Sequence, residues 1–152
     1  MMTMEELEGL VGREFPGGTF EISEEKNDAF VGAVHGDAAA QGLEGGFAHP
    51  MFGHMAAHAG KGVDVGQFFE MCGASLEDGV VFGEGGLEFH APLRAGVTYS
   101  VGGVVEKVAR KTGARTGTFD AVTTRLEMRD PDGGLVVVST ETTIFPRREV
   151  AA

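Results

Sequence analysis

The fold is decided by three stretches of the chain: VTYSVGGVV at residues 97–105, TFDAVTTRLEM at 118–128 and LVVVSTETTIF at 135–145. Apolar residues recur at every second position in each stretch, which is typical of β-strands, whose side chains alternate between two faces. The sequence DPDGG at 130–134 predicts a turn between the last two strands, and KTGAR at 111–115 predicts one between the first two. The strands are therefore expected to be antiparallel neighbours.

One face of each strand is expected to be apolar. GLEFHAPL at 86–93 predicts an earlier strand of the same sheet. The residues expected to share a face within each of the three later strands are Val97, Tyr99, Val101 and Val105, then Val122, Leu126 and Met128, then Val136, Val138 and Ile144.

Before about residue 80 the apolar pattern is that of helices. Ser23 is placed to cap a helix over about 23–34, and Pro50 suits the first position of a helix that ends near Gly60. A short third helix is expected within residues 63–73. The helix at about 51–59 is apolar enough to cover the sheet. We therefore predict an α+β fold, in which a curved antiparallel sheet packs against one central helix.

Length and composition favour a single globular domain over residues 1–152. The chain has 152 residues, of which 42% are hydrophobic and 23% are charged, enough to bury one core. No apolar run reaches the roughly 20 residues that a membrane span requires, and the first ten residues are acidic rather than signal-like. We expect no membrane association and a cytoplasmic location.

Charge is unevenly distributed along the chain. The net charge is −11, which argues against nucleic-acid binding. Residues 1–93 hold 16 acidic and 3 basic side chains, while the remainder holds 7 acidic and 9 basic. Four basic residues lie close together and could bind a nucleotide phosphate: Lys107, Arg110, Lys111 and Arg115. The alternative for this basic cluster is a solvated hairpin end.

The single cysteine, Cys72, lies in the apolar stretch QFFEMCG. One cysteine cannot form an internal disulfide or a cysteine-based zinc cluster. We therefore expect Cys72 to be a buried structural thiol rather than a nucleophile.

GEGGLEFHAPLRAGVTY at 83–99, followed by strands ending in TTIFPRR at 142–148, resembles the MaoC-like hydratase/dehydratase family of the hot-dog fold. The resemblance is to its N-terminal MaoC-like type and covers about residues 11–148. GREFPGGTFEISEE at 12–25 supports it, as does FAHPMFGHMA at 47–56, which is similar to the loop opening the central helix in that family.

This resemblance implies hydration of trans-2-enoyl thioesters, or dehydration of (R)-3-hydroxyacyl thioesters, on coenzyme A or a carrier protein and without a cofactor. The chemistry needs one acid–base group at the α carbon and a second that handles water at the β carbon. A backbone N–H at a helix start would stabilise the thioester oxygen. The implied catalytic residues are Asp37 and His49, and the implied substrate contacts at the helix start are Met51, Phe52 and Gly53.

The family's catalytic motif, Gly-Asp-x-Asn-Pro-x-His, is incomplete in HGDAAAQGLEGG at 35–46. Gly36 and Asp37 match its start, but Ala39 and Ala40 replace Asn-Pro, and Gly42 stands where the histidine is expected. With Asp37 but without the histidine, the chain would be a poor hydratase.

Three functions stay open at this point. The first is a non-catalytic hot-dog subunit that pairs with a catalytic homologue and shapes half of the acyl tunnel. For assembly, the resemblance implies a homodimer or a heterodimer with a catalytic MaoC-like subunit. The second is an active hydratase whose histidine comes from His35, His49, His54 or His58. In the third case it is a hot-dog thioesterase or acyl-thioester binding protein, with a carboxylate from Glu44 or Glu70.

His54 and His58 stand four residues apart, the helical spacing with which two imidazoles bind one metal ion. No third ligand is evident close to them in the chain. The expectation from sequence is therefore no metal, with the pair on a polar helix side or at a subunit contact.

Overall fold

The computed structural model describes residues 1–34, 36–37 and 43–147. The sequence-based assignments for His35 and Gly42 fall outside these residues. No helix in the described part of the chain is long and apolar enough to span a membrane.

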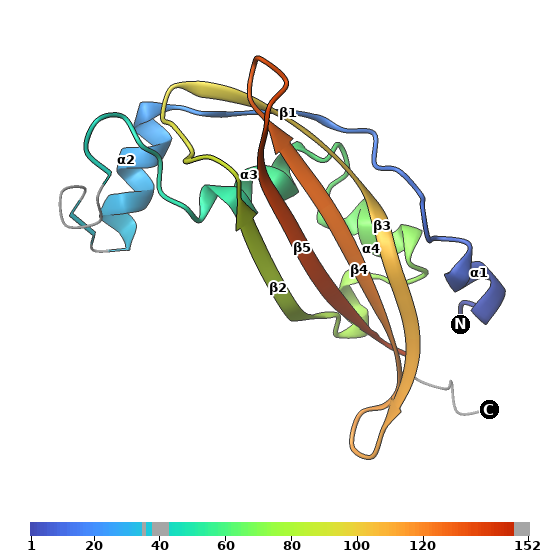
Figure 1. Ribbon diagram of the computed structural model, residues 1–152. Coiled ribbons are helices and arrows are strands. Elements are labelled where there is room, and N and C mark those ends of the chain that lie inside the picture. Colours follow the sequence, from blue (N-terminus) through green and yellow to red (C-terminus); the bar gives the residue numbers. More distant parts are fainter. Residues whose placement is uncertain (35, 38–42, 148–152) are drawn as a thin grey trace.

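Five antiparallel strands form one curved sheet, as the alternating pattern predicts (Figure 1). Consecutive strands β3, β4 and β5 are neighbours, so the predicted meander is confirmed. The order across the sheet is β1 (Gly18–Ile22), β3 (Val97–Gly113), β4 (Gly117–Arg129), β5 (Leu135–Pro146) and β2 (Val81–Phe89).

The helices are α1 (Met4–Glu8), α2 (Glu24–Ala33), α3 (Phe52–Gly60) and α4 (Val65–Met71), with a 3-10 turn η1 (Leu76–Asp78). In Figure 1, α3 and α4 lie behind the sheet, while α2 lies to its left and α1 to its right.

The helix boundaries follow local capping. Ser23 caps α2 as predicted, with its Oγ accepting a hydrogen bond from the N–H of Lys26 at 3.1 Å. The central helix begins at Phe52, two residues after the predicted Pro50. The shift arises because residues 49–53 first form tight turns, in which Phe52 N–H donates to the carbonyl of His49.

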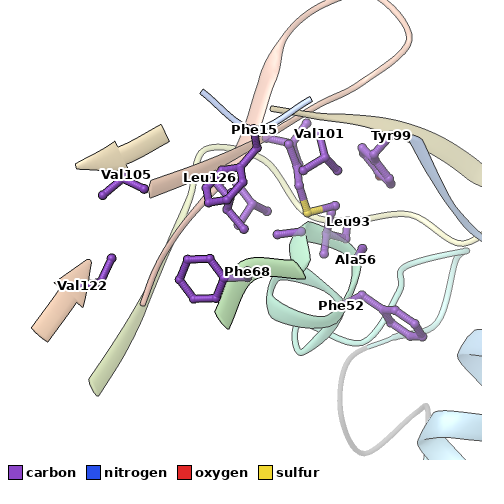
Figure 2. Close-up of a cluster of buried hydrophobic side chains, with 14 of the residues drawn as sticks. Phe15, Phe52, Ala56, Phe68, Leu93, Tyr99, Val101, Val105, Val122 and Leu126 are labelled. Atoms are coloured by element: carbon purple, nitrogen blue, oxygen red, sulfur yellow. The ribbon is translucent and has the colours of Figure 1, made fainter. Parts of the chain in front are cut away.

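The core lies between α3 and the sheet (Figure 2). Ala56 and Ala57 are fully buried, and Gly60 approaches β3 so closely that a Cβ there would lie 2.6 Å from Cγ2 of Val101. Small residues therefore allow the helix to lie directly on the sheet. Large side chains supplied mainly by the strands fill the space around it, including Tyr99, Val101, Val105, Val122, Leu126, Met128 and Phe145.

The face of β5 that points to the core differs from the predicted one. Of the predicted residues Val136, Val138 and Ile144, only Val136 belongs to the core cluster, which instead takes Val137 and Phe145, both fully buried, from the other face of the strand. Residues 136–138 are all nearly inaccessible, so both faces are covered there. Alternation carries no information where a strand is buried on both faces.

A buried carboxylate links β3, β4 and the residue after β5 at one end of the sheet. Asp120 is fully buried and accepts from Nε and Nη2 of Arg110 at 2.7 and 2.9 Å, and from Nε of Arg147 at 2.7 Å. Arg147 also donates to the carbonyls of Cys72 and Gly73 after α4. Burial alone would raise the pKa of Asp120, but the hydrogen bonds and charges of the two arginines outweigh burial and hold that pKa below its ordinary value.

Removing this carboxylate should destabilise the protein strongly, because two arginines would lose their buried counter-charge. We expect Asp120→Ala to lower the free energy of unfolding by about 3–5 kcal/mol, measured by urea denaturation with circular dichroism. The matched control is Glu127→Ala, which breaks the more exposed Arg125–Glu127–Arg129 cluster and should cost about 1 kcal/mol or less. Equal losses for the two variants would contradict a structural role for Asp120.

Candidate functional site

The loop before α3 is pinned to the segment between β2 and β3. Ala48 N–H donates to the carbonyl of Leu93 at 2.8 Å, and Phe47 forms a β-bridge with Arg94, whose guanidinium stacks 4.8 Å from the Phe47 ring. A hollow of about 690 Å³ opens beside this contact. It is lined mainly by apolar residues, among them Leu43, Phe47, Pro50, Phe89 and Leu93.

His49 is held firmly beside this hollow. Its backbone N–H donates to Oδ1 of Asn27 at 2.8 Å, and its ring meets Phe30 edge-on with centroids 4.8 Å apart. Nδ1 of His49 accepts from the N–H of Met51 at 3.1 Å, which places the proton of a neutral ring on Nε2. His49 is therefore oriented as a donor through Nε2.

The second predicted catalytic residue, Asp37, is exposed and lies just beyond α2. Residues 38–42 of the same motif lie outside the described chain, so the pairing of Asp37 with His49 stays a prediction.

The predicted substrate contacts at the helix start separate into two kinds. Phe52 is 4% exposed and packs against Phe30, and a Cβ on Gly53 would meet the Phe89 ring and Val137 at 3.2 Å. Core packing therefore explains the positions of both Phe52 and Gly53. Met51 is 43% exposed, so among the three it is the most accessible to a ligand, and its role stays a prediction.

Arg110, one of the four residues in the basic cluster, is tied to Asp120 and also donates to the carbonyl of Met2 at 2.7 Å. It is therefore committed to the fold. Lys107, Lys111 and Arg115 are exposed near the β3–β4 hairpin, which lies at the end of the sheet opposite α2 (Figure 1). Within one chain the structure does not bring this cluster to His49, and phosphate binding by the three exposed residues stays a prediction.

A different polar group lies between α3 and β5. Nε2 of His58 lies 3.0 Å and Nδ1 of His54 lies 3.7 Å from Oε2 of Glu141, and Nδ1 of His58 lies 3.3 Å from Nζ of Lys61. Lys61 is only 5% exposed. We call these four residues the inner polar cluster. It borders a hollow of about 600 Å³ and a smaller, more apolar one of about 200 Å³.

Burial shifts several pKa values in the inner polar cluster. Burial lowers the pKa of His54, and it lowers the pKa of Lys61 despite the opposing charges of Glu141 and Asp64. Burial acts to raise the pKa of Glu141, but the contact with His58, the two histidine charges and a bond from Thr143 outweigh it, and that pKa lies below its ordinary value. Glu141 is therefore ionised at neutral pH.

The carboxylates considered for a thioesterase do not join this cluster. Glu44 is exposed in the turn before α3, and Glu70 is exposed on α4. Sequence reasoning singled out the histidine pair but missed Glu141, which lies 83 residues after His58. The available signal was a charged residue among apolar and threonine residues in a predicted strand.

The chain is similar to several known proteins. A family model described as FAS1-like, dehydratase domain region, matches residues 9–139. One similar solved structure is a C-terminally truncated HadBC (3R-hydroxyacyl-ACP dehydratase) complex from Mycobacterium tuberculosis, at 23% identity over 95% of this chain and 99% of that chain, with a TM-score of 0.65. No curated protein sequence matches.

Two further structures extend the comparison. The ChsH1–ChsH2 complex from Mycobacterium tuberculosis has 16% identity over 97% of this chain and 94% of that chain, with a TM-score of 0.67. A MaoC-like dehydratase from Rhodospirillum rubrum has 21% identity over 95% and 98%, with a TM-score of 0.60. At these identities the likeness establishes a common fold, and it confirms the predicted hot-dog architecture.

Cys72 should be chemically inert in the native protein, as expected from sequence. It is fully buried, and burial raises the pKa of its thiol to about 12. We expect no reaction with a chromogenic disulfide reagent under native conditions and one thiol per chain in denaturant. Rapid labelling of the folded protein would contradict this assignment.

Proposed function

We propose that this chain, which belongs to the FAS1-like dehydratase family of MaoC-like hot-dog proteins, is a hydratase/dehydratase subunit that depends on a catalytic hot-dog partner. The substrate class is an acyl thioester on coenzyme A or a carrier protein. We further propose that residues 1–152 form one domain and that the protein acts in the cytoplasm.

The observation that carries this proposal is Gly42, which stands where the family motif has its histidine. Hydration needs a second acid–base group beside Asp37, because one carboxylate cannot both manage water and deliver the α proton efficiently. His49 is anchored near the start of α3 by Asn27, Phe30 and Met51. That position suits a donor to a thioester oxygen better than a mobile proton shuttle.

The edge strand β2 supports a partner. Among the described residues it pairs only with β5, so its outer edge offers backbone N–H and C=O groups that no described strand pairs with. Its apolar side chains are unusually open to solvent: Val81 is 54%, Phe82 61% and Phe89 42% exposed. Addition of a second hot-dog subunit at this edge would cover them. The similar HadBC and ChsH1–ChsH2 structures are both described as complexes, which is consistent with such a pairing.

The first test is turnover. We expect the isolated chain to hydrate crotonyl-CoA at or near background, and a mixture with a catalytic MaoC-like subunit, such as a neighbouring gene product, to be active. Loss of the conjugated thioester absorbance measures hydration. Release of free coenzyme A measures thioesterase activity in the same sample.

Robust hydration by the pure chain that is abolished by Asp37→Ala or His49→Ala would overturn the proposal in favour of an autonomous hydratase. Asp132→Ala is the control, because Asp132 is an exposed aspartate in the turn between β4 and β5, away from the hollow. Release of coenzyme A without hydration would identify a thioesterase.

The second test is assembly. Phe82→Glu should reduce pairing, whether with a second copy or with a catalytic partner, because it places a charge in an apolar edge that pairing would bury. Light scattering coupled to size exclusion measures the change. Leu76→Glu is the control, since Leu76 is 69% exposed but lies on η1 rather than on β2. A wild-type chain that stays a clean, folded monomer in the presence of candidate partners would count against the proposal.

A further inference from the structure

The inner polar cluster contains a set of metal-binding groups from two distant parts of the chain. His54 and His58 project from the same side of α3 with ring centroids 4.5 Å apart, and Glu141 comes from the face of β5 that points to α3. One nitrogen from each ring and one carboxylate oxygen all lie within 4.8 Å of one another.

We propose that His54, His58 and Glu141 are the three protein ligands of a divalent metal ion, for which zinc is the best match. Two imidazoles and one carboxylate are a donor set that zinc accepts in sites with an open fourth position. That position would face the hollow of about 600 Å³ that these three side chains border. Water or a small anionic ligand would complete the coordination.

The distances are close to those of a metal site. Ligand atoms of a tetrahedral zinc lie about 3.3 Å apart, given bonds of about 2.0–2.2 Å. The contacts of Glu141 with His58 and His54 are 3.0 and 3.7 Å, and all three donor atoms lie within 4.8 Å of one another, so the two rings must come closer together to take up tetrahedral positions.

The existing hydrogen bonds leave the donor atoms available. Nε2 of His58 is buried and, although 3.0 Å from Glu141, is not aligned for a hydrogen bond with any described group. Oε1 of Glu141 accepts from Oγ1 of Thr143 at 3.3 Å, while Oε2 faces the histidines. Thr143 therefore orients the carboxylate as the outer groups of metal sites commonly do.

Lys61 opposes the metal and gives the proposal a distinctive test. When Nε2 of His58 binds an ion, Nδ1 must carry the ring proton, so Nδ1 can no longer accept from the Lys61 ammonium 3.3 Å away. The cation also repels that ammonium. Replacing Lys61 with methionine should therefore tighten metal binding. A plain His–Glu ion pair without a metal predicts no such gain.

The first experiment titrates zinc into the full chain, freed of any histidine tag, by calorimetry and by competition with a chromogenic chelator. We expect one saturable ion per chain. His54→Ala, His58→Ala and Glu141→Gln should each weaken binding at least about tenfold, and Lys61→Met should strengthen it about tenfold. His90→Ala is the matched control, because its ring also lies 3.1 Å from a glutamate, Glu88, without a second histidine beside it.

Cobalt supplies an independent readout. The wild-type chain with Co²⁺ should show the intense visible bands of a tetrahedral ion, and His58→Ala should lose them. Absence of saturable binding to the wild type, or binding that survives all three ligand substitutions, would overturn the proposal. A gain in affinity by Lys61→Met cannot be attributed to unfolding, and a failure to gain in a variant that keeps the wild-type circular dichroism counts against the proposal. Circular dichroism checks the fold of each variant.

Discussion

The close approach of α3 to the sheet is the constraint on which the rest of the structure depends. A helix can lie directly on a curved sheet only if the residues at the contact are small, and here they are Gly53, Ala56, Ala57 and Gly60. The strands then supply most of the large core side chains. The same geometry leaves the histidines of α3 at the side of the contact, where they meet the polar stretch of β5. Packing thus determines where buried polar chemistry can occur.

Buried charges are neutralised locally at two places in this arrangement. Asp120 is held by two arginines at one end of the sheet, and Glu141 is accompanied by Lys61 and two histidines near the middle of β5. Burying a charge is costly unless such partners are present. Arg110 therefore belongs to the fold, although its position in a basic run suggested a ligand contact.

Much of the fold could be predicted from local pattern, because alternation, capping and turn residues act over a few positions. Ser23, the 130–134 turn and the three consecutive strands follow directly. The placement of β1 beside β3 and of β2 beside β5 could not be read locally, since both pairings join distant segments. The candidate site shows the same limit. The spacing of His54 and His58 was visible in the sequence. Glu141 comes to lie beside them only through the register of the sheet, which local pattern does not reveal.

The charge on β2 bears on which partner the proposed pairing would favour. The register places Phe82, Leu87 and Phe89 on the α3 side of this strand and Glu84 and Glu88 on the other. Two copies joined edge to edge would bring these glutamates onto one shared outer surface, in a chain that already carries a net charge of −11. Like charges across paired strands are destabilising. A different hot-dog subunit with basic residues on its edge would keep the apolar contact and remove that repulsion, so charge favours a mixed pair.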